Sequence, residues 1–130
     1  MPDSLRSKVR DTLTKVASEY PAGDLRSAQM ADIDRIAFHV TLVLSWGCKA
    51  VCDIGGGIGM FSVGCAAMGM NATLVDDFRD AVNLHYGDDV LKLHRAHGVT
   101  VISRDVIAEG VPGQLGPVLE FCIACWHFVT

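Results

Sequence analysis

A glycine-rich segment, VCDIGGGIGMF, contains the residues with the clearest chemical meaning in this 130-residue chain. An apolar stretch ends at Asp53 and leads into Gly55, Gly57 and Gly59, with Gly56 between the first two. Glycine has no Cβ, so a turn built from it can take positive φ angles and lets a ligand approach the backbone closely. The spacing predicts a ligand-binding loop at the carboxyl end of a parallel strand, where open α/β sheets bind their ligands.

Acidic residues follow the next two predicted strands, at the same edge of the sheet. In the segment ATLVDDF, Asp76 and Asp77 come at the end of the second strand. A carboxylate there can accept hydrogen bonds from the two vicinal hydroxyls of a ribose. Both aspartates stay candidates, because a shift of the strand end by one residue would exchange them, and Asp77 has helix capping as its alternative role. Asp105 comes directly after the third strand, where turn formation is the alternative to ligand binding.

The glycine spacing separates the two classes of cofactor that bind at such a loop. The dinucleotide fingerprint GxGxxG requires glycine at position 60, where the chain has Met60. An NAD(P)-binding oxidoreductase is therefore kept only as an alternative hypothesis.

An acidic residue followed by glycine at every second position resembles motif I of the class I S-adenosylmethionine-dependent methyltransferases. The resemblance extends over residues 51–109 and implies a Rossmann-like α/β fold that binds S-adenosyl-L-methionine. It further implies that the loop wraps the methionine portion, that Asp76 holds the ribose, with Asp77 as the competing choice, and that Asp105 accepts a hydrogen bond from the adenine amino group. The cofactor-binding residues implied in this way are Asp53, Gly55, Gly56, Gly57, Gly59, Asp76, Asp77, Asp105 and Val106, the last lying against the adenine ring.

The elements that must position these residues alternate between helices and short buried strands. Apolar residues at steps of three and four predict helices over residues 4–20, 24–46, 60–68 and 79–97. Short apolar runs predict strands over residues 50–54, 72–75 and 99–103, and over 120–129 as a fourth strand beside the first. This order predicts a partial doubly wound parallel sheet preceded by N-terminal helices, with right-handed crossovers that place helices on alternating faces.

We divide the chain into an N-terminal helical lid, residues 1–46, and a partial Rossmann-like cofactor-binding unit, residues 47–130, folded together as one domain. The lid resembles the variable helices that precede the first strand in such methyltransferases. Tyr20, Met30 and His39 could reach a cofactor from it, although packing within a helix face is the alternative for each.

Composition limits the partners. A formal net charge of -4 gives no basic field for nucleic acid, so a small-molecule methyl acceptor is favoured. The first twenty residues lack the apolar core of a secretory signal, and no apolar run is long enough for a membrane span, so we expect a cytoplasmic protein.

Cysteine usage is the second compositional signal. The odd number of cysteines predicts buried, reduced thiols rather than a disulfide framework. Cys122, Cys125 and His127 together would leave a zinc site one ligand short, so no metal is expected. The five cysteines are Cys48, Cys52, Cys65, Cys122 and Cys125.

The methyltransferase pattern stops at the fourth strand, so we expect a cofactor-binding half that is truncated before the acceptor half and incomplete for catalysis. His127 is the nearest candidate general base and is interpreted as a packed or terminal histidine, so the sequence indicates no catalytic residue. A non-enzymatic module is the third hypothesis. It would self-associate through an exposed sheet edge left at the first strand.

Overall fold

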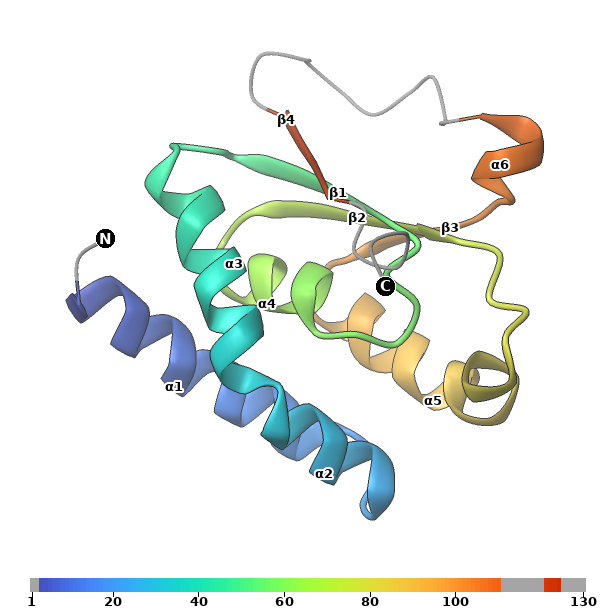
Figure 1. Cartoon of the computed structure of the whole chain (residues 1–130), viewed down its shortest axis with the longest axis horizontal. Helices are drawn as coiled ribbons and strands as arrows, with labels where there is room; N and C mark the ends of the chain where they lie inside the picture. The colour runs from blue at the N-terminus through green and yellow to red at the C-terminus, as the bar shows by residue number, and fades with distance from the viewer. Residues whose placement is uncertain (1–2, 111–120, 125–130) are drawn as a thin grey trace.

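The computed structural model describes residues 3–110 and 121–124 and confirms an α/β architecture with a parallel sheet (Figure 1). The described strands form one sheet in the order β3-β2-β1-β4. They are β1 (Ala50–Ile54), β2 (Asn71–Asp76), β3 (Thr100–Ser103) and β4 (Phe121–Ala124). The helices are α1 (Asp3–Glu19), α2 (Asp24–Ala31), α3 (Ile33–Ser45), α4 (Phe61–Ala67), α5 (Ala81–Ala96) and α6 (Val106–Glu109).

The single helix predicted over residues 24–46 is wrong, because the chain breaks at Asp32 into α2 and α3. Asp32 has φ -99° and ψ 1°, and its carboxylate accepts hydrogen bonds from the Arg35 guanidinium at 2.8 and 2.6 Å. Met30, before the break, is 36% exposed, whereas Ile36 and Val40, after it, are buried. Gly47, at φ 75°, follows the end of α3.

Helices α4 and α5 lie on the same face of the sheet, which corrects the expected alternation of faces (Figure 1). The reason is that β1, β2 and β3 follow one another in one direction across the sheet, so two right-handed crossovers fall on one side. The direction reverses only at β4, which pairs with the other edge of β1. Helix α6 lies toward the opposite face, where Val106 packs against Cys52, Ile54 and Val75.

Strand β4 confirms the predicted fourth strand beside β1 over residues 121–124. Residues 125–129 of that prediction lie outside the described residues. Because β1 pairs with β2 on one side and β4 on the other, the expectation that the first strand is an exposed edge is wrong. Among the described strands, β3 and β4 form the edges of the sheet.

The N-terminal helices form a layer packed against α4, on the side of α4 away from the sheet (Figure 1). Close packing depends on Gly64 of α4, because a Cβ at this position would lie 2.6 Å from Cδ2 of Leu13 on α1. Tyr20, Phe61 and Leu13 are among the largest fully buried side chains of this core. The division of the chain at residue 46 stays a prediction.

The expectation of five reduced thiols is wrong for Cys48, which is disulfide-bonded. Cys52 and Cys65 are free and buried, as predicted. Cys48 lies half-buried just before β1, and spacing along the chain does not reveal which cysteines meet after folding. The side chains of Cys122, Cys125 and His127 lie outside the described residues.

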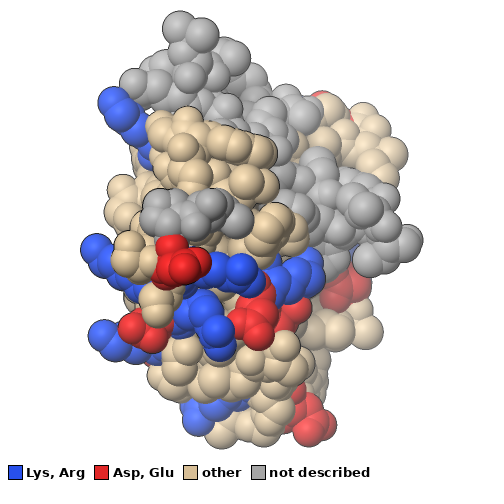
Figure 2. Space-filling view, turned by 60° about the vertical axis from the view of Figure 1, so that its left-hand side comes forward, with Lys and Arg blue, Asp and Glu red and all other residues tan. Residues whose placement is uncertain are grey.

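The surface in Figure 2 carries Lys and Arg interspersed with Asp and Glu. Ion pairs between Arg10 and Asp34, at 3.2 Å, and between Arg35 and Asp32, at 2.6 Å, link opposite charges on the N-terminal helices. This face therefore offers no field of a single sign. None of the described helices combines the length and apolar content needed to cross a bilayer.

Candidate functional site

The turn between β1 and α4 needs glycine for two different reasons. Gly55 and Gly57 have φ angles of 76° and 53°, in the left-handed region that side-chain-bearing residues rarely adopt. Gly56 needs to lack a side chain because an added Cβ would lie 2.1 Å from Oδ2 of Asp53. The Gly55 N–H donates to the Val75 carbonyl at 2.7 Å, which ties the loop to β2.

Asp53 lies at the base of this loop and is only 1% exposed. The Ser62 N–H donates to its carboxylate, but Oδ1 has no hydrogen-bond partner among the described residues. Burial and, secondly, the negative charge of Asp76 raise the pKa of Asp53 to about 7. Asp53 therefore lies against the core side of the loop with a raised pKa.

Asp76, the last residue of β2, joins the glycine loop to the turn that follows β2. Its Oδ1 accepts the Phe78 N–H at 2.8 Å, and its Oδ2 lies 3.5 Å from the Cβ position of Gly57. Burial, as the largest cause, raises the pKa of this half-buried carboxyl group. The turn is strained, because Phe78 has φ 55°.

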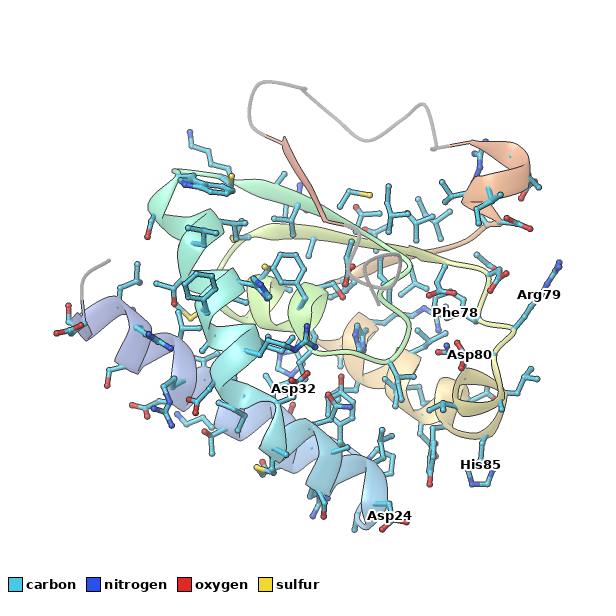
Figure 3. All side chains as sticks on the ribbon, in the orientation of Figure 1. Asp24, Asp32, Phe78, Arg79, Asp80 and His85 are labelled. Carbon is cyan, nitrogen blue, oxygen red and sulfur yellow. The ribbon has the colours of Figure 1, made fainter. Side chains whose placement is uncertain are left out.

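Asp77 is used differently, because its Oδ1 accepts the Arg79 N–H at 3.1 Å within the same turn. Phe78, Arg79 and Asp80 follow one another along the segment from β2 to α5, and the Arg79 side chain points away from the fold (Figure 3). Of the two aspartates, only Asp76 lies against the glycine loop in the contacts that the structure describes.

A pocket of about 200 Å³ opens at the carboxyl ends of β1, β2 and β3. Five of the residues predicted from the sequence line it, namely Gly55, Asp76, Asp77, Asp105 and Val106. The other four, Asp53, Gly56, Gly57 and Gly59, are not among the described residues that line it. Gly57 nevertheless adjoins the pocket wall, since its Cβ position is 3.5 Å from Oδ2 of Asp76.

Asp105 lines the pocket and also stabilises the turn after β3, the role that the sequence left open as the alternative to ligand binding. It caps α6, its Oδ1 accepting the Ala108 N–H at 3.1 Å, while its own N–H donates to Glu109 at 3.1 Å. One oxygen of the carboxylate thus fixes the turn after β3. The neighbouring Val106 packs against the sheet, which leaves the 83%-exposed Ile107 as a further apolar side chain of the pocket.

The sequence did not predict the other five pocket residues, which are Ile54, Val75, Asp80, Arg104 and Ile107. A signal existed for Asp80, which caps α5 by accepting the Asn83 N–H at 2.9 Å, because an aspartate just before a helical stripe is typical of an N-cap. Arg104 donates to the Glu109 carbonyl at 2.8 Å, and its buried Nε has no partner among the described residues. Helix α6 itself was not predicted, so no pattern pointed to Ile107.

The charge of the pocket is acidic. Four carboxylates and one guanidinium line it, from Asp76, Asp77, Asp80, Asp105 and Arg104. Such a lining favours ligands that carry hydroxyl donors or positive charge and disfavours phosphate groups.

The three lid residues named from the sequence lie in different places. Tyr20 is fully buried, and its hydroxyl donates to the carbonyls of Ile58 and Gly59 in the glycine loop. Met30 is exposed on α2, and His39 on α3 has a pKa lowered by burial. Only Tyr20 of these three contacts the loop in the hydrogen bonds that the structure describes.

No protein-family model, curated protein or solved structure matches the chain. Within residues 3–110 and 121–124, no group of three or more His, Cys, Asp or Glu side chains could hold a metal ion. The site is therefore interpreted from its own geometry.

Proposed function

We propose that this chain is the S-adenosyl-L-methionine-binding domain of a class I methyltransferase with a partial, doubly wound Rossmann-like fold. The observation that carries the proposal is the place of Asp76 in the pocket wall, with Oδ2 3.5 Å from the Cβ position of Gly57 in the left-handed glycine turn. The position of the pocket supports it, because open α/β sheets bind ligands outside the carboxyl ends of their strands, and the pocket lies at those ends of β1, β2 and β3.

The residues present fit the cofactor in three places. The half-buried carboxylate of Asp76 lines the pocket and is an acceptor suited to the ribose hydroxyls. Asp105, with Val106 and Ile107, offers one acceptor and two apolar side chains for an adenine. The loop beside Gly56 and Gly57 leaves no room for side chains, and the buried Oδ1 of Asp53 beneath it has no partner among the described residues.

When bound, the cofactor supplies an electrophilic sulfonium methyl group. The work of this chain's residues is to bind and orient: the glycine loop approaches closely, Asp76 fixes the ribose, and the apolar side chains of α6 exclude water from the ring. Positioning of this kind supplies much of the rate enhancement in transfers where the leaving group is already good. We assign no general base.

The alternative, an NAD(P)-binding oxidoreductase, is disfavoured by two features of the site. Met60, in the place of the third glycine of the dinucleotide fingerprint, is fully buried. A dinucleotide would also bring a pyrophosphate toward a pocket lined by four carboxylates. The same acidic lining favours a small-molecule methyl acceptor over nucleic acid.

Thermal unfolding tests the proposal. S-adenosylhomocysteine at a hundred times its dissociation constant should stabilise the folded chain by about 2.7 kcal/mol. For a domain of this size that raises the melting temperature by on the order of 10 °C. NAD at the same concentration should give no measurable rise in the melting temperature. An equal shift with NAD, or none with S-adenosylhomocysteine, contradicts the proposal.

A further inference from the structure

The carbonyl groups of the glycine loop are hydrogen-bonded from the core by a residue far away in the sequence. The Tyr20 hydroxyl donates to the Ile58 carbonyl at 2.8 Å and to the Gly59 carbonyl at 3.2 Å. Tyr20 follows α1, is fully buried, and does not line the pocket. Burial and the nearby charge of Asp53 raise the pKa of its hydroxyl, so it stays protonated and remains a donor.

A second buried side chain reaches the same carbonyl from α5. His94 is fully buried, with Nε2 3.2 Å from the Gly59 oxygen and Nδ1 2.9 Å from the Val90 oxygen of its own helix. The neutral ring carries one proton, so it donates to Gly59 when the proton is on Nε2 and to Val90 when it is on Nδ1. Gly59 therefore accepts from the segment after α1 and, in the Nε2-protonated tautomer, also from helix α5.

These contacts fix the direction of one peptide group. The carbonyl and the N–H of a trans peptide point in opposite directions. Holding the Gly59 carbonyl toward Tyr20 and His94 therefore holds the Met60 N–H away from them. On the same loop, Asp53 occupies the place where a Cβ of Gly56 would lie. The loop is thus supported from the core by side chains of three separate elements.

We propose that Tyr20 and His94 are positioning residues of the glycine loop, which set its peptide groups for ligand binding without contacting the ligand. The effect on cofactor affinity rests on the proposed function, whereas the effect on the loop itself does not. The inference gives the N-terminal helices a role in the site: Tyr20 acts through the loop from beneath it rather than by covering the cofactor.

Two variants of the full chain remove one donor each and keep an aromatic ring. Tyr20→Phe deletes the hydroxyl alone, and His94→Phe deletes the imidazole nitrogens. Tyr86→Phe and His85→Gln are the matched controls, because Tyr86 is a half-buried tyrosine of α5 and His85 is exposed on the same helix. His94→Gln returns a side-chain N–H donor and serves as the rescue.

Hydrogen exchange of the ligand-free protein reports on the loop directly. We expect Tyr20→Phe and His94→Phe to speed exchange at the amides of residues 57–61 and to leave those of β1 unchanged. The control variants should match the unsubstituted chain, and His94→Gln should recover at least half of the lost protection. An equal rise in β1 and the loop would mean a merely structural role and would overturn the inference, as would no rise at all.

Calorimetric titration with S-adenosylhomocysteine measures the consequence for binding. Tyr20→Phe should weaken affinity about five- to tenfold, the worth of roughly one hydrogen bond. An unchanged dissociation constant in both variants, while the unsubstituted chain binds, overturns the inference and leaves the proposed function intact. Failure of the unsubstituted chain to bind refutes the proposed function instead, and the exchange result then decides on the positioning role alone.

Discussion

Aspartates lie both on the core side of the glycine loop and in the pocket beside it. The one on the core side is buried, whereas Asp76 and Asp77 in the pocket are partly exposed. On the core side, Asp53, Tyr20 and His94 are almost completely buried and contact loop backbone or lie against it. In the pocket, Asp76 and Asp77 are only partly buried, and they keep a face toward the cavity while accepting backbone N–H groups of their own turn.

This difference separates two roles that the sequence motif combines. A carboxylate without water or a full set of partners carries a raised pKa and a cost in stability, as at Asp53. The pocket carboxylate of Asp76 also has a pKa raised by burial, but it is only half-buried and keeps a face toward the cavity for a ligand. Substitutions on the core side should therefore change stability and loop order, and those in the pocket should change ligand affinity.

The largest expected effect is that of Gly56→Ala on the core side. The added Cβ would meet the buried Asp53 carboxylate at 2.1 Å, so the loop or the strand end must shift, and we expect a loss of roughly 3 kcal/mol or more in unfolding free energy. Gly87→Ala on α5 is the control, because a Cβ there meets nothing within 4 Å; it should stabilise the chain by up to about 1 kcal/mol. Urea unfolding of both variants checks this, and a loss below about 1 kcal/mol for Gly56→Ala would contradict the close packing.

The next effect is a pH dependence produced by Asp53. Its folded-state pKa of about 7 lies above the ordinary value of 3.8, so the folded state binds the proton more tightly than the unfolded state does. Stability from this group is full below about pH 4 and is lost as the pH rises to about 7. Asp53→Asn cannot titrate, so its stability relative to the unsubstituted chain should rise by roughly 3–4 kcal/mol between pH 4 and pH 8. Unfolding curves at both pH values that show a constant difference would contradict the raised pKa.

A smaller effect, and one on affinity rather than stability, is expected at the end of β2. Asp76→Ala should weaken S-adenosylhomocysteine binding by about 1.5–3 kcal/mol, the usual worth of hydrogen bonds to a charged group. Asp77→Ala should cost much less, because Asp77 caps its own turn and makes no bond to the loop among those described. Titration of the two variants side by side tests the choice, and the reverse order would exchange their roles.

The smallest effect is expected at Asp80, on the rim of the pocket. Loss of its cap to the Asn83 N–H in Asp80→Ala should cost about 1 kcal/mol of stability. Affinity for S-adenosylhomocysteine should change by less than twofold, because the side chain serves the helix end. A tenfold loss of affinity with unchanged stability would place Asp80 in the binding site proper.

What the sequence predicted well was local. The glycine turn and the first three strands follow from backbone freedom and short-range pattern, and the ends of these strands lie within one residue of their predicted positions. The break at Asp32 was missed because the apolar stripe continues across it, so packing rather than pattern decides where the helix ends.

What the sequence could not predict depends on contacts between distant segments. Tyr20 is separated from Ile58 by 38 residues and His94 from Gly59 by 35. In the sequence, nothing distinguishes either of them from an ordinary buried aromatic residue. The disulfide at Cys48 and the pocket role of Arg104 are of the same kind. Each depends on contacts between segments that are far apart in the sequence. The periodicity of apolar residues describes only local structure.

Calorimetric titration of the unsubstituted full chain with S-adenosylhomocysteine, and in parallel with NAD, tests the central claim most directly. A single-site isotherm for S-adenosylhomocysteine that is lost or weakened at least tenfold in Asp76→Ala, with no heat of binding for NAD, is the predicted result. Binding of NAD in place of S-adenosylhomocysteine, or binding of S-adenosylhomocysteine that is indifferent to Asp76, would contradict it.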